Sequence, residues 1–155
     1  MSIHQKLVRA PASLELHCAE AQAWTAFWQE QPDNSRCLER ASGAVRNELS
    51  RHWREVASRF RTPTDVIDLG CGSGFVGTEL VDANPFVAVR GVDAAAVRPS
   101  ACARLNIQGA VFMESLPFSA ASFDAAVSQF GFEYSKVELA TREVARVLKD
   151  RKSVV

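Results

Sequence analysis

The sequence of 155 residues has no excess charge, because 18 Lys and Arg residues balance 18 Asp and Glu residues. It therefore lacks the basic surplus that draws proteins to nucleic acids or anionic membranes, and we expect neither partner. No apolar run approaches the roughly 20 residues that cross a bilayer. The first residues lack the apolar core of a secretion signal. Repeats and low-complexity stretches are also missing, which leaves one domain of ordinary globular composition.

Closely spaced cysteines are missing as well. The four cysteines lie far apart and include no C-x-x-C pair: Cys18, Cys37, Cys71 and Cys102. This spacing argues against zinc fingers, iron–sulfur sites and a disulfide framework. Free thiols suit a reducing compartment, so we expect a cytoplasmic protein. The three histidines have no partner at metal-ligand or triad spacing, and we expect no metal site.

Two amphipathic helices are predicted in an N-terminal helical segment, residues 13–61, that follows a tail at residues 1–12. Apolar residues recur every three or four positions from Leu14 to Trp28 and again from Leu38 to Phe60. The opposite face of the second helix is rich in arginine, which indicates either a solvated surface or a patch for an anionic partner. The aromatic residues near Trp28 are expected either to pack on a sheet or to form part of a lid.

From residue 62 to residue 155 strands and helices alternate, which predicts an α/β fold with a doubly wound, Rossmann-like parallel sheet of four or five strands. The predicted strands are Asp65–Leu69, Phe86–Asp93, Ala110–Met113 and Phe123–Ser128, with Lys152–Val155 as a strand just begun. The predicted helices run to about Ala83, over residues 95–105, and from Val137 to Leu148. Ligands of such sheets bind at the carboxyl ends of the strands.

A glycine-rich loop follows the first predicted strand and leads into a helix. Its glycines permit positive φ and close approach of a ligand to the backbone, and the free amides of the helix start face that ligand. Gly72–Gly77 fits the pattern G-x-G-x-x-G, and Asp93 ends the next strand about 20 residues later, where an acid that binds a ribose belongs. The pattern alone is compatible with a nicotinamide or flavin dinucleotide.

Asp68 distinguishes between two classes of ligand, because it lies two residues before Gly70 at the mouth of the loop. A carboxylate there repels the pyrophosphate of a dinucleotide. It attracts S-adenosylmethionine, which has no phosphate and carries a sulfonium and an ammonium group. The same charge therefore disfavours the first ligand and favours the second.

Four segments resemble class I S-adenosylmethionine-dependent methyltransferases. Asp68–Gly74 is similar to the first motif of that family, D-x-G-x-G-x-G, and Gly91–Asp93 is similar to the second. Glu114–Phe118, followed by Ser122–Asp124, resembles the "LPF…FD" segment of the small-molecule branch that includes quinone-biosynthesis methyltransferases. Arg146–Lys149 resembles the segment before the fifth strand of the family. The resemblance covers about residues 62–150.

The resemblance implies a set of cofactor-binding residues. Asp68 would hold the methionine amino group, Asp93 the ribose, and Ala94, Met113 and Glu114 the adenine. The Phe112-Met113 pair departs from the Asp-Ala of many relatives, and Met113 is also compatible with a core position. The backbone of the glycine loop would lie against the cofactor, and two residues after the fourth strand would lie between methionine and acceptor: Gly70, Cys71, Gly72, Gly74, Ser128 and Gln129. Cys71 is otherwise read as a small neutral filler, and Gln129 as a solvated loop residue.

The leading hypothesis is a methyltransferase of small-molecule acceptors, with no catalytic residue identified. The family normally has seven strands, so we expect that residues 62–155 lack the C-terminal strands. The chain would then be a piece of a longer protein or one half of an assembly, such as a homo-oligomer. The alternatives are a non-catalytic binding or partner module that retains the fold, and a dinucleotide oxidoreductase.

Overall fold

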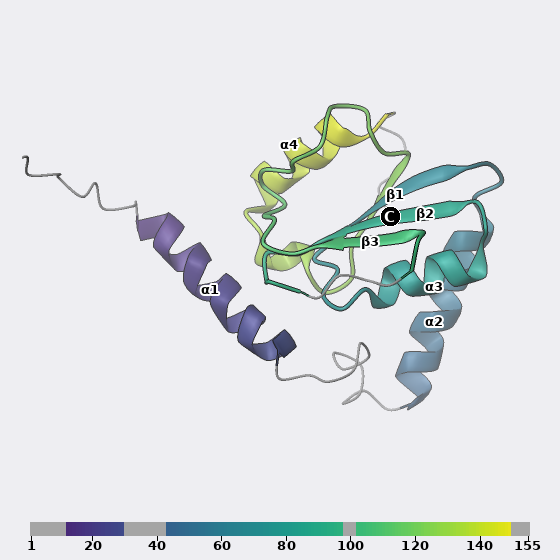
Figure 1. Cartoon of the computed structure of the whole chain (residues 1–155), viewed down its shortest axis with the longest axis horizontal. Coiled ribbons are helices and arrows are strands. Elements are labelled where there is room, and N and C mark those ends of the chain that lie inside the picture. The colour runs from purple at the N-terminus through teal and green to yellow at the C-terminus, as the bar shows by residue number, and fades with distance from the viewer. Residues whose placement is uncertain (1–11, 30–42, 98–101, 150–155) are drawn as a thin grey trace, which may run out of the picture.

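The computed structural model describes residues 12–29, 43–97 and 102–149, and these ranges contain helices on both sides of one sheet (Figure 1). The elements are α1 (Ala12–Gln29), α2 (Gly43–Ser58), β1 (Thr64–Leu69), α3 (Phe75–Ala83), β2 (Val87–Val92), β3 (Leu105–Gln108), β4 (Ala125–Val127), η1 (Phe132–Tyr134) and α4 (Val137–Val147). None of the helices in these ranges has the length and hydropathy that a bilayer crossing requires.

The sheet has four strands in the order β3-β2-β1-β4, and every pairing is parallel. This confirms the predicted α/β fold with a doubly wound parallel sheet and N-terminal helices. β1 lies in the middle, where Asp68 pairs with Gly91 of β2 and Val127 of β4. The carboxyl end of β1 is therefore flanked by two strands, and it is the point at which the strand order reverses direction.

Alternate residues of the strands pack into two separate hydrophobic cores, one on each face of the sheet. Val66 and Val127 pack with α2 and α3 on one face, whereas Ile67 and Ala126 pack with α4 on the other. Figure 1 shows this division, with α2 and α3 on one side of the sheet and α4 on the opposite side. Since side chains alternate along a strand, Asp68 belongs to the face of Val66 and points toward the side of α2 and α3.

The predictions between residues 95 and 113 are wrong. The predicted helix over 95–105 is absent from Ala95–Val97 and Cys102–Arg104, and its residues 98–101 lie outside the described residues. The third strand is Leu105–Gln108 instead of Ala110–Met113. Ala110 has a φ of 57°, which breaks an extended chain immediately after Gly109. Gly109 lies so close to the 95–97 segment that a Cβ would come within 2.6 Å of the Val97 nitrogen. The predicted strand is thus a loop whose Val111 fills the core under α4.

The other predicted elements occur with adjusted ends. The predicted helix from Leu38 begins at Gly43 among the described residues, and positions 38–42 lie outside them. The predicted tail at residues 1–12 also falls outside the described residues, except for Ala12, which begins α1, and so does the predicted strand at Lys152–Val155.

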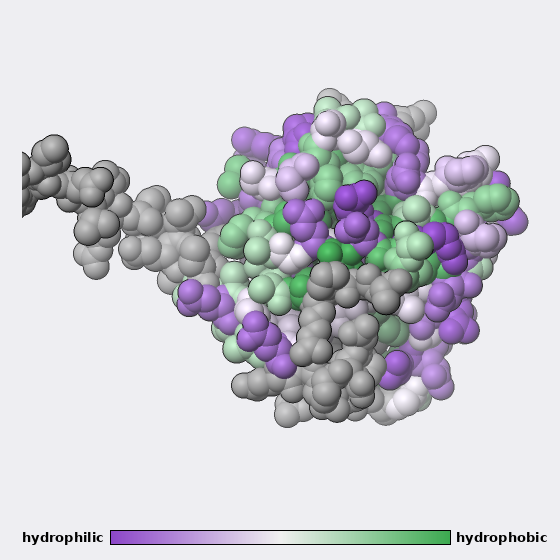
Figure 2. Space-filling view, viewed as in Figure 1, coloured by the Kyte–Doolittle hydropathy of each residue, from purple (hydrophilic) through white to green (hydrophobic). Residues whose placement is uncertain are grey.

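Two arginines of α2, and Arg59 just after its end, pair with carboxylates. Arg51 pairs with Glu48, Arg54 with Glu79 at 2.8 Å, and Arg59 with Glu55 at 3.3 Å. These exposed pairs fit a solvated helix face better than a site for an anion. Figure 2 shows hydrophilic residues over much of the visible face, with hydrophobic residues exposed among them.

Asn84 ties the end of α2 to the sheet. Its side chain is 6% exposed, and its amide nitrogen donates to the Ala57 and Phe60 carbonyls at 2.7 and 2.9 Å. Its side-chain oxygen accepts from the Phe86 amide at 2.9 Å. One buried side chain thus satisfies the last carbonyls of a helix and the amide that precedes β2.

We predict that Asn84→Ala lowers the free energy of unfolding by about 2 kcal/mol, because it leaves buried polar groups unpaired. Urea unfolding followed by circular dichroism measures the change. Asn106→Ala on the exposed side of β3 is the matched control and should change stability by less than about 0.5 kcal/mol. Equal effects of the two substitutions would contradict the role of Asn84.

Candidate functional site

The loop between β1 and α3 forms the floor of the site, and its conformation requires glycine. Gly70, Gly72 and Gly74 have φ values of 69°, 51° and 87°. A Cβ on Gly70 would lie 2.9 Å from the Cα of Gly131, so the loops after β1 and β4 touch through their backbones. Because these glycines carry no side chains, the backbone of the loop stays accessible to a ligand at the carboxyl edge of the sheet.

Asp68 ends β1 as a buried carboxylate without a partner. The residue is 1% exposed, and neither of its oxygens has a hydrogen-bond partner among the described residues. Burial, followed by the nearby charge of Asp93, raises the pKa of Asp68 to about 7. The Gly77 amide, which does not meet hydrogen-bond geometry, is the smallest influence and lowers the pKa. An orphaned buried charge is costly unless a ligand compensates it.

Asp93 follows β2 and faces the same loop. Its Oδ2 accepts from the Gly72 amide at 2.8 Å, and its Oδ1 accepts from the Ala95 amide at 2.9 Å. Burial raises the pKa of Asp93, and these two hydrogen bonds work against that rise. The carboxylate is therefore held in a fixed orientation at the lip of the site.

A cavity of about 310 Å³ lies over these groups. All charged side chains in its lining are acidic: Glu20, Asp68, Asp93 and Glu114. The remaining lining residues are Ala21, Trp24, Trp28, Gly70, Cys71, Gly72, Ser73, Phe75, Val76, Ala94, Phe112, Met113, Gln129, Phe130, Gly131, Tyr134 and Ser135. The described wall thus combines negative charge with apolar surface and contains no Lys or Arg.

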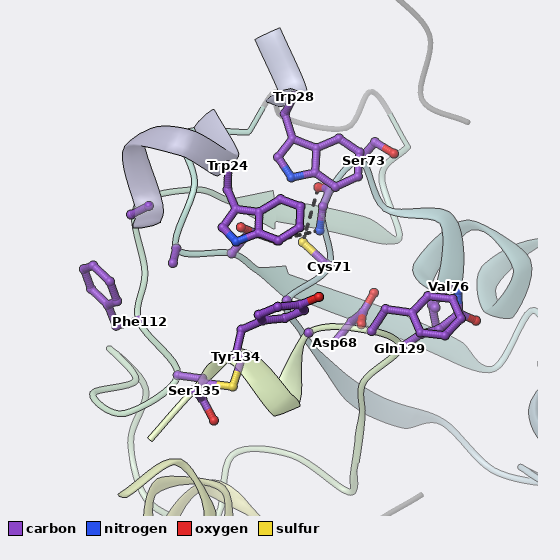
Figure 3. Close-up of a pocket in the computed structure, with 18 of the residues that line it drawn as sticks. Trp24, Trp28, Asp68, Cys71, Ser73, Val76, Phe112, Gln129, Tyr134 and Ser135 are labelled. Carbon is purple, nitrogen blue, oxygen red and sulfur yellow. Dashed lines mark hydrogen bonds between the residues drawn. The ribbon is translucent and has the colours of Figure 1, made fainter. Parts of the chain in front are cut away.

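Helix α1 covers the cavity with aromatic rings. Thr25 accepts a hydrogen bond from the Ala96 amide at 2.9 Å, which fixes the helix near the end of β2. The Trp28 ring fills the space in which a Cβ of Gly72 would lie, only 2.3 Å from the ring. Trp24 meets Tyr134 edge to face at 5.4 Å, and Figure 3 shows the two tryptophans on the side of the cavity away from Asp68. Of the two interpretations of these aromatic residues, the arrangement favours the lid.

The wall on the predicted adenine side is fastened by α4. Arg146 donates to the carbonyls of Phe118 at 2.7 Å and Leu116 at 3.0 Å. Glu143 accepts from the Leu116 amide at 2.8 Å. Glu114 accepts from the Lys136 amide at 2.7 Å, which joins this loop to the start of α4.

Most of the predicted site residues come together at the cavity, but two do not line it. Ser128 donates its hydroxyl to the Leu69 carbonyl at 2.7 Å and thereby links the ends of β4 and β1. Gly74 caps α3 and packs against Ile107. Met113 lines the cavity from a loop instead of the predicted strand. Burial raises the pKa of the Cys71 thiol, in agreement with a neutral filler.

Sequence reasoning assigned no role in the site to Glu20 or Ser135, and it saw Trp53 only as part of an apolar stripe. Trp53 is 4% exposed, and its indole nitrogen donates to the Gln129 side-chain oxygen at 2.6 Å. For Glu20, the only available signal was its spacing of four residues from Trp24, which places both on one face of a helix.

The sequence of this chain is also similar to a known protein family. The model of that family, described as a methyltransferase domain, matches residues 67–155. The chain belongs to this family. No curated protein shows significant sequence similarity to it.

Solved structures share the fold of this methyltransferase domain. The protein described as a methyltransferase in complex with the Trm112 activator of Haloferax volcanii is 26% identical, with a TM-score of 0.55 over 70% of this chain and 53% of its own. A sarcosine dimethylglycine methyltransferase homologue from Galdieria sulphuraria is 22% identical, with a TM-score of 0.59 over 74% and 47%. An S-adenosylmethionine-dependent methyltransferase homologue from Methanococcus maripaludis is 18% identical, with a TM-score of 0.57 over 97% and 64%. The chain spans about half the length of the first of these matches.

The cofactor that this family implies is S-adenosylmethionine, and the residues present fit it. The unpartnered carboxylate of Asp68 suits a positively charged ligand, and the acidic lining does not suit a diphosphate. The positive φ values of Gly70 and Gly72 keep side chains out of the floor. The fit therefore rests on charge and on accessible backbone.

We predict that Asp68→Asn stabilises the ligand-free protein at pH 8 while it abolishes binding of S-adenosylhomocysteine. The substitution removes a buried charge but also removes the partner of the ligand ammonium. Thermal unfolding should show a higher Tm, by about 2–4 °C per kcal/mol gained, and calorimetry should show the loss of binding. Asp124→Asn changes a half-buried acid outside the cavity, which pairs with Lys149 and accepts from the Asp65 amide, and it should leave binding unchanged.

The raised pKa of Asp68 also predicts how stability varies with pH. Because the folded pKa of about 7 lies above the ordinary value of 3.8, the stabilisation is complete below about pH 4 and is lost as the pH rises through 7. The Tm of the ligand-free protein should therefore fall between pH 5 and pH 8. The slope should be smaller in Asp68→Asn, with Asp93 contributing in the same direction. An identical slope in both proteins would contradict the assignment.

Proposed function

We propose that this chain binds S-adenosylmethionine in the cavity and transfers its methyl group to a small-molecule acceptor. The observation that carries the proposal is the buried, unpartnered carboxylate of Asp68 in a described wall whose charges are all negative. Such a wall attracts the sulfonium and ammonium groups of the donor. It repels the phosphates of a dinucleotide, which disfavours an oxidoreductase.

Each predicted cofactor residue has a role that its position supports. Asp68 pairs with the ammonium group at the inner end of the cavity, and Asp93 accepts hydrogen bonds from the ribose hydroxyls at the lip. Ala94, Met113 and the side chain of Glu114 surround the adenine. The backbone from Gly70 to Gly72 lies beneath the nucleoside, where a side chain would obstruct it.

When bound, S-adenosylmethionine supplies a methyl group that an acceptor oxygen, nitrogen or carbon takes in line, and the sulfur keeps the bonding electron pair. The protein then has to align the acceptor and exclude water. Trp24, Trp28 and Tyr134 perform the second task as an aromatic cover. Phe130, which is 61% exposed and has a φ of 58°, is held in a conformation costly for a bulky residue at the acceptor side.

Finer features of the proposal rest on the sequence. The segment Glu114–Phe118 supports the branch that includes quinone-biosynthesis enzymes. We assign cofactor binding to residues 62–155, and the cover to α1 within the helical segment 13–61. The thiol of Cys71, which forms no disulfide, supports a cytoplasmic location.

Calorimetric titration with S-adenosylhomocysteine tests the proposal on the whole chain. We predict measurable binding by the wild-type protein and at least tenfold weaker binding by Asp93→Asn, because an amide is a poorer acceptor for two hydroxyls than a carboxylate. Asp82→Asn, an exposed acid on α3, is the matched control and should leave the affinity unchanged.

Two outcomes would overturn the proposal. A folded wild-type chain that shows no binding at millimolar S-adenosylhomocysteine does not have the proposed site. Binding of NADH in a fluorescence titration, with no response to S-adenosylhomocysteine, would instead point to a dinucleotide.

A further inference from the structure

Gln129 is the neutral amide in the cavity wall, and α2 holds it. Its side-chain oxygen accepts from the Trp53 indole nitrogen at 2.6 Å, across 76 positions of sequence. Trp53 lies in the core between α2 and the sheet with 4% exposure. It precedes the part of the chain that the family model matches, residues 67–155.

The chemistry of the indole fixes which way the amide faces. An indole nitrogen only donates hydrogen bonds, so the Gln129 oxygen has to turn toward Trp53. The amide nitrogen, with its two N–H donors, then turns away from Trp53. Since Gln129 lines the cavity, a donor pair is available to a ligand at this point of the wall.

This donor pair shares one end of the cavity with Asp68. Asp68 pairs with Val127 across the sheet, and Gln129 lies two residues beyond Val127, in the loop that follows β4, and lines the same cavity. Figure 3 shows Asp68 and Gln129 together, on the side of the cavity away from the tryptophans of α1. A carboxylate and a neutral double donor thus stand together at the inner end.

An amino acid carries charges that suit this pair. Its ammonium group fits Asp68, and its carboxylate needs donors within an acidic wall that offers no described Lys or Arg. A neutral amide gives such donors without a positive charge, which would repel the adjacent sulfonium. Asp68 and Gln129 can therefore bind both charged groups of the methionine portion.

We propose that Gln129 donates to the ligand carboxylate and that Trp53 is the positioning residue that keeps its amide in the required orientation. The proposal rests on the function proposed above and extends the site to α2. It also predicts a specificity: the pocket selects nucleosides that carry an intact amino-acid end.

The test compares two ligands on the wild-type chain and on Trp53→Phe, which removes the indole donor and keeps an aromatic ring. S-adenosylhomocysteine has the amino-acid end, and 5′-methylthioadenosine is the same type of nucleoside thioether without it. We expect the dissociation constant of S-adenosylhomocysteine to rise about five- to tenfold in Trp53→Phe, the loss of one oriented hydrogen bond to a charged group. That of 5′-methylthioadenosine should change less than about twofold, since it does not use Gln129.

A second variant covers the case in which Trp53→Phe fails to fold. Gln129→Glu can still accept from Trp53, but it places a negative charge against the ligand carboxylate, so it should weaken S-adenosylhomocysteine more than Trp53→Phe does and leave 5′-methylthioadenosine unaffected. Gln108→Glu, an exposed position on β3, is its matched control.

The outcomes separate this inference from the proposed function. Equal weakening of both ligands in either variant would show a merely structural role and overturn the inference. Unchanged binding of S-adenosylhomocysteine in either variant would overturn it as well, while the proposed function would stand. Equal wild-type affinity for the two ligands would overturn the inference and also the pairing of Asp68 with the ammonium group. Failure of the wild-type chain to bind either nucleoside would instead overturn the proposed function.

Discussion

The central constraint on this molecule is a negative charge buried at the end of its middle strand. Asp68 sits between Gly91 and Val127 in the sheet and has no hydrogen-bond partner in the described structure. A folded domain tolerates such a group when a bound ligand offsets the cost of its desolvation. The glycine loop, the acid at the end of β2 and the acidic wall all follow from the need to admit a positively charged nucleoside to that point.

The part of the fold that the sequence predicts best is the part set by local backbone requirements. The Asp68–Gly74 segment needs positive φ at three glycines, and this need is visible in the residue types themselves. The predictions from Ala95 to Met113 were wrong because the spacing of the apolar residues there is compatible with a helix or a strand. Ala110 adopts a left-handed φ there, and only contacts with the 95–97 segment explain why.

The site shows the same division between local and distant causes. Asp68, Asp93 and the glycines could be found from spacing alone, whereas Ser128 turns its hydroxyl to the Leu69 carbonyl for reasons that involve two strands. The pairing of Trp53 with Gln129 joins residues from a helix and a loop that no periodicity connects. Residues that act through a partner far away in sequence become visible only when the chain is folded.

The clamp by which Arg146 and Glu143 hold the 116–118 loop bears on how the protein is made. On a ribosome the chain emerges from its N-terminus, so β1, α3 and β2 are available long before α4. The nucleoside side of the pocket acquires its fastening only after residue 146 has left the exit tunnel. A nascent chain interrupted before that point would retain the glycine loop but lack the support for the wall opposite it.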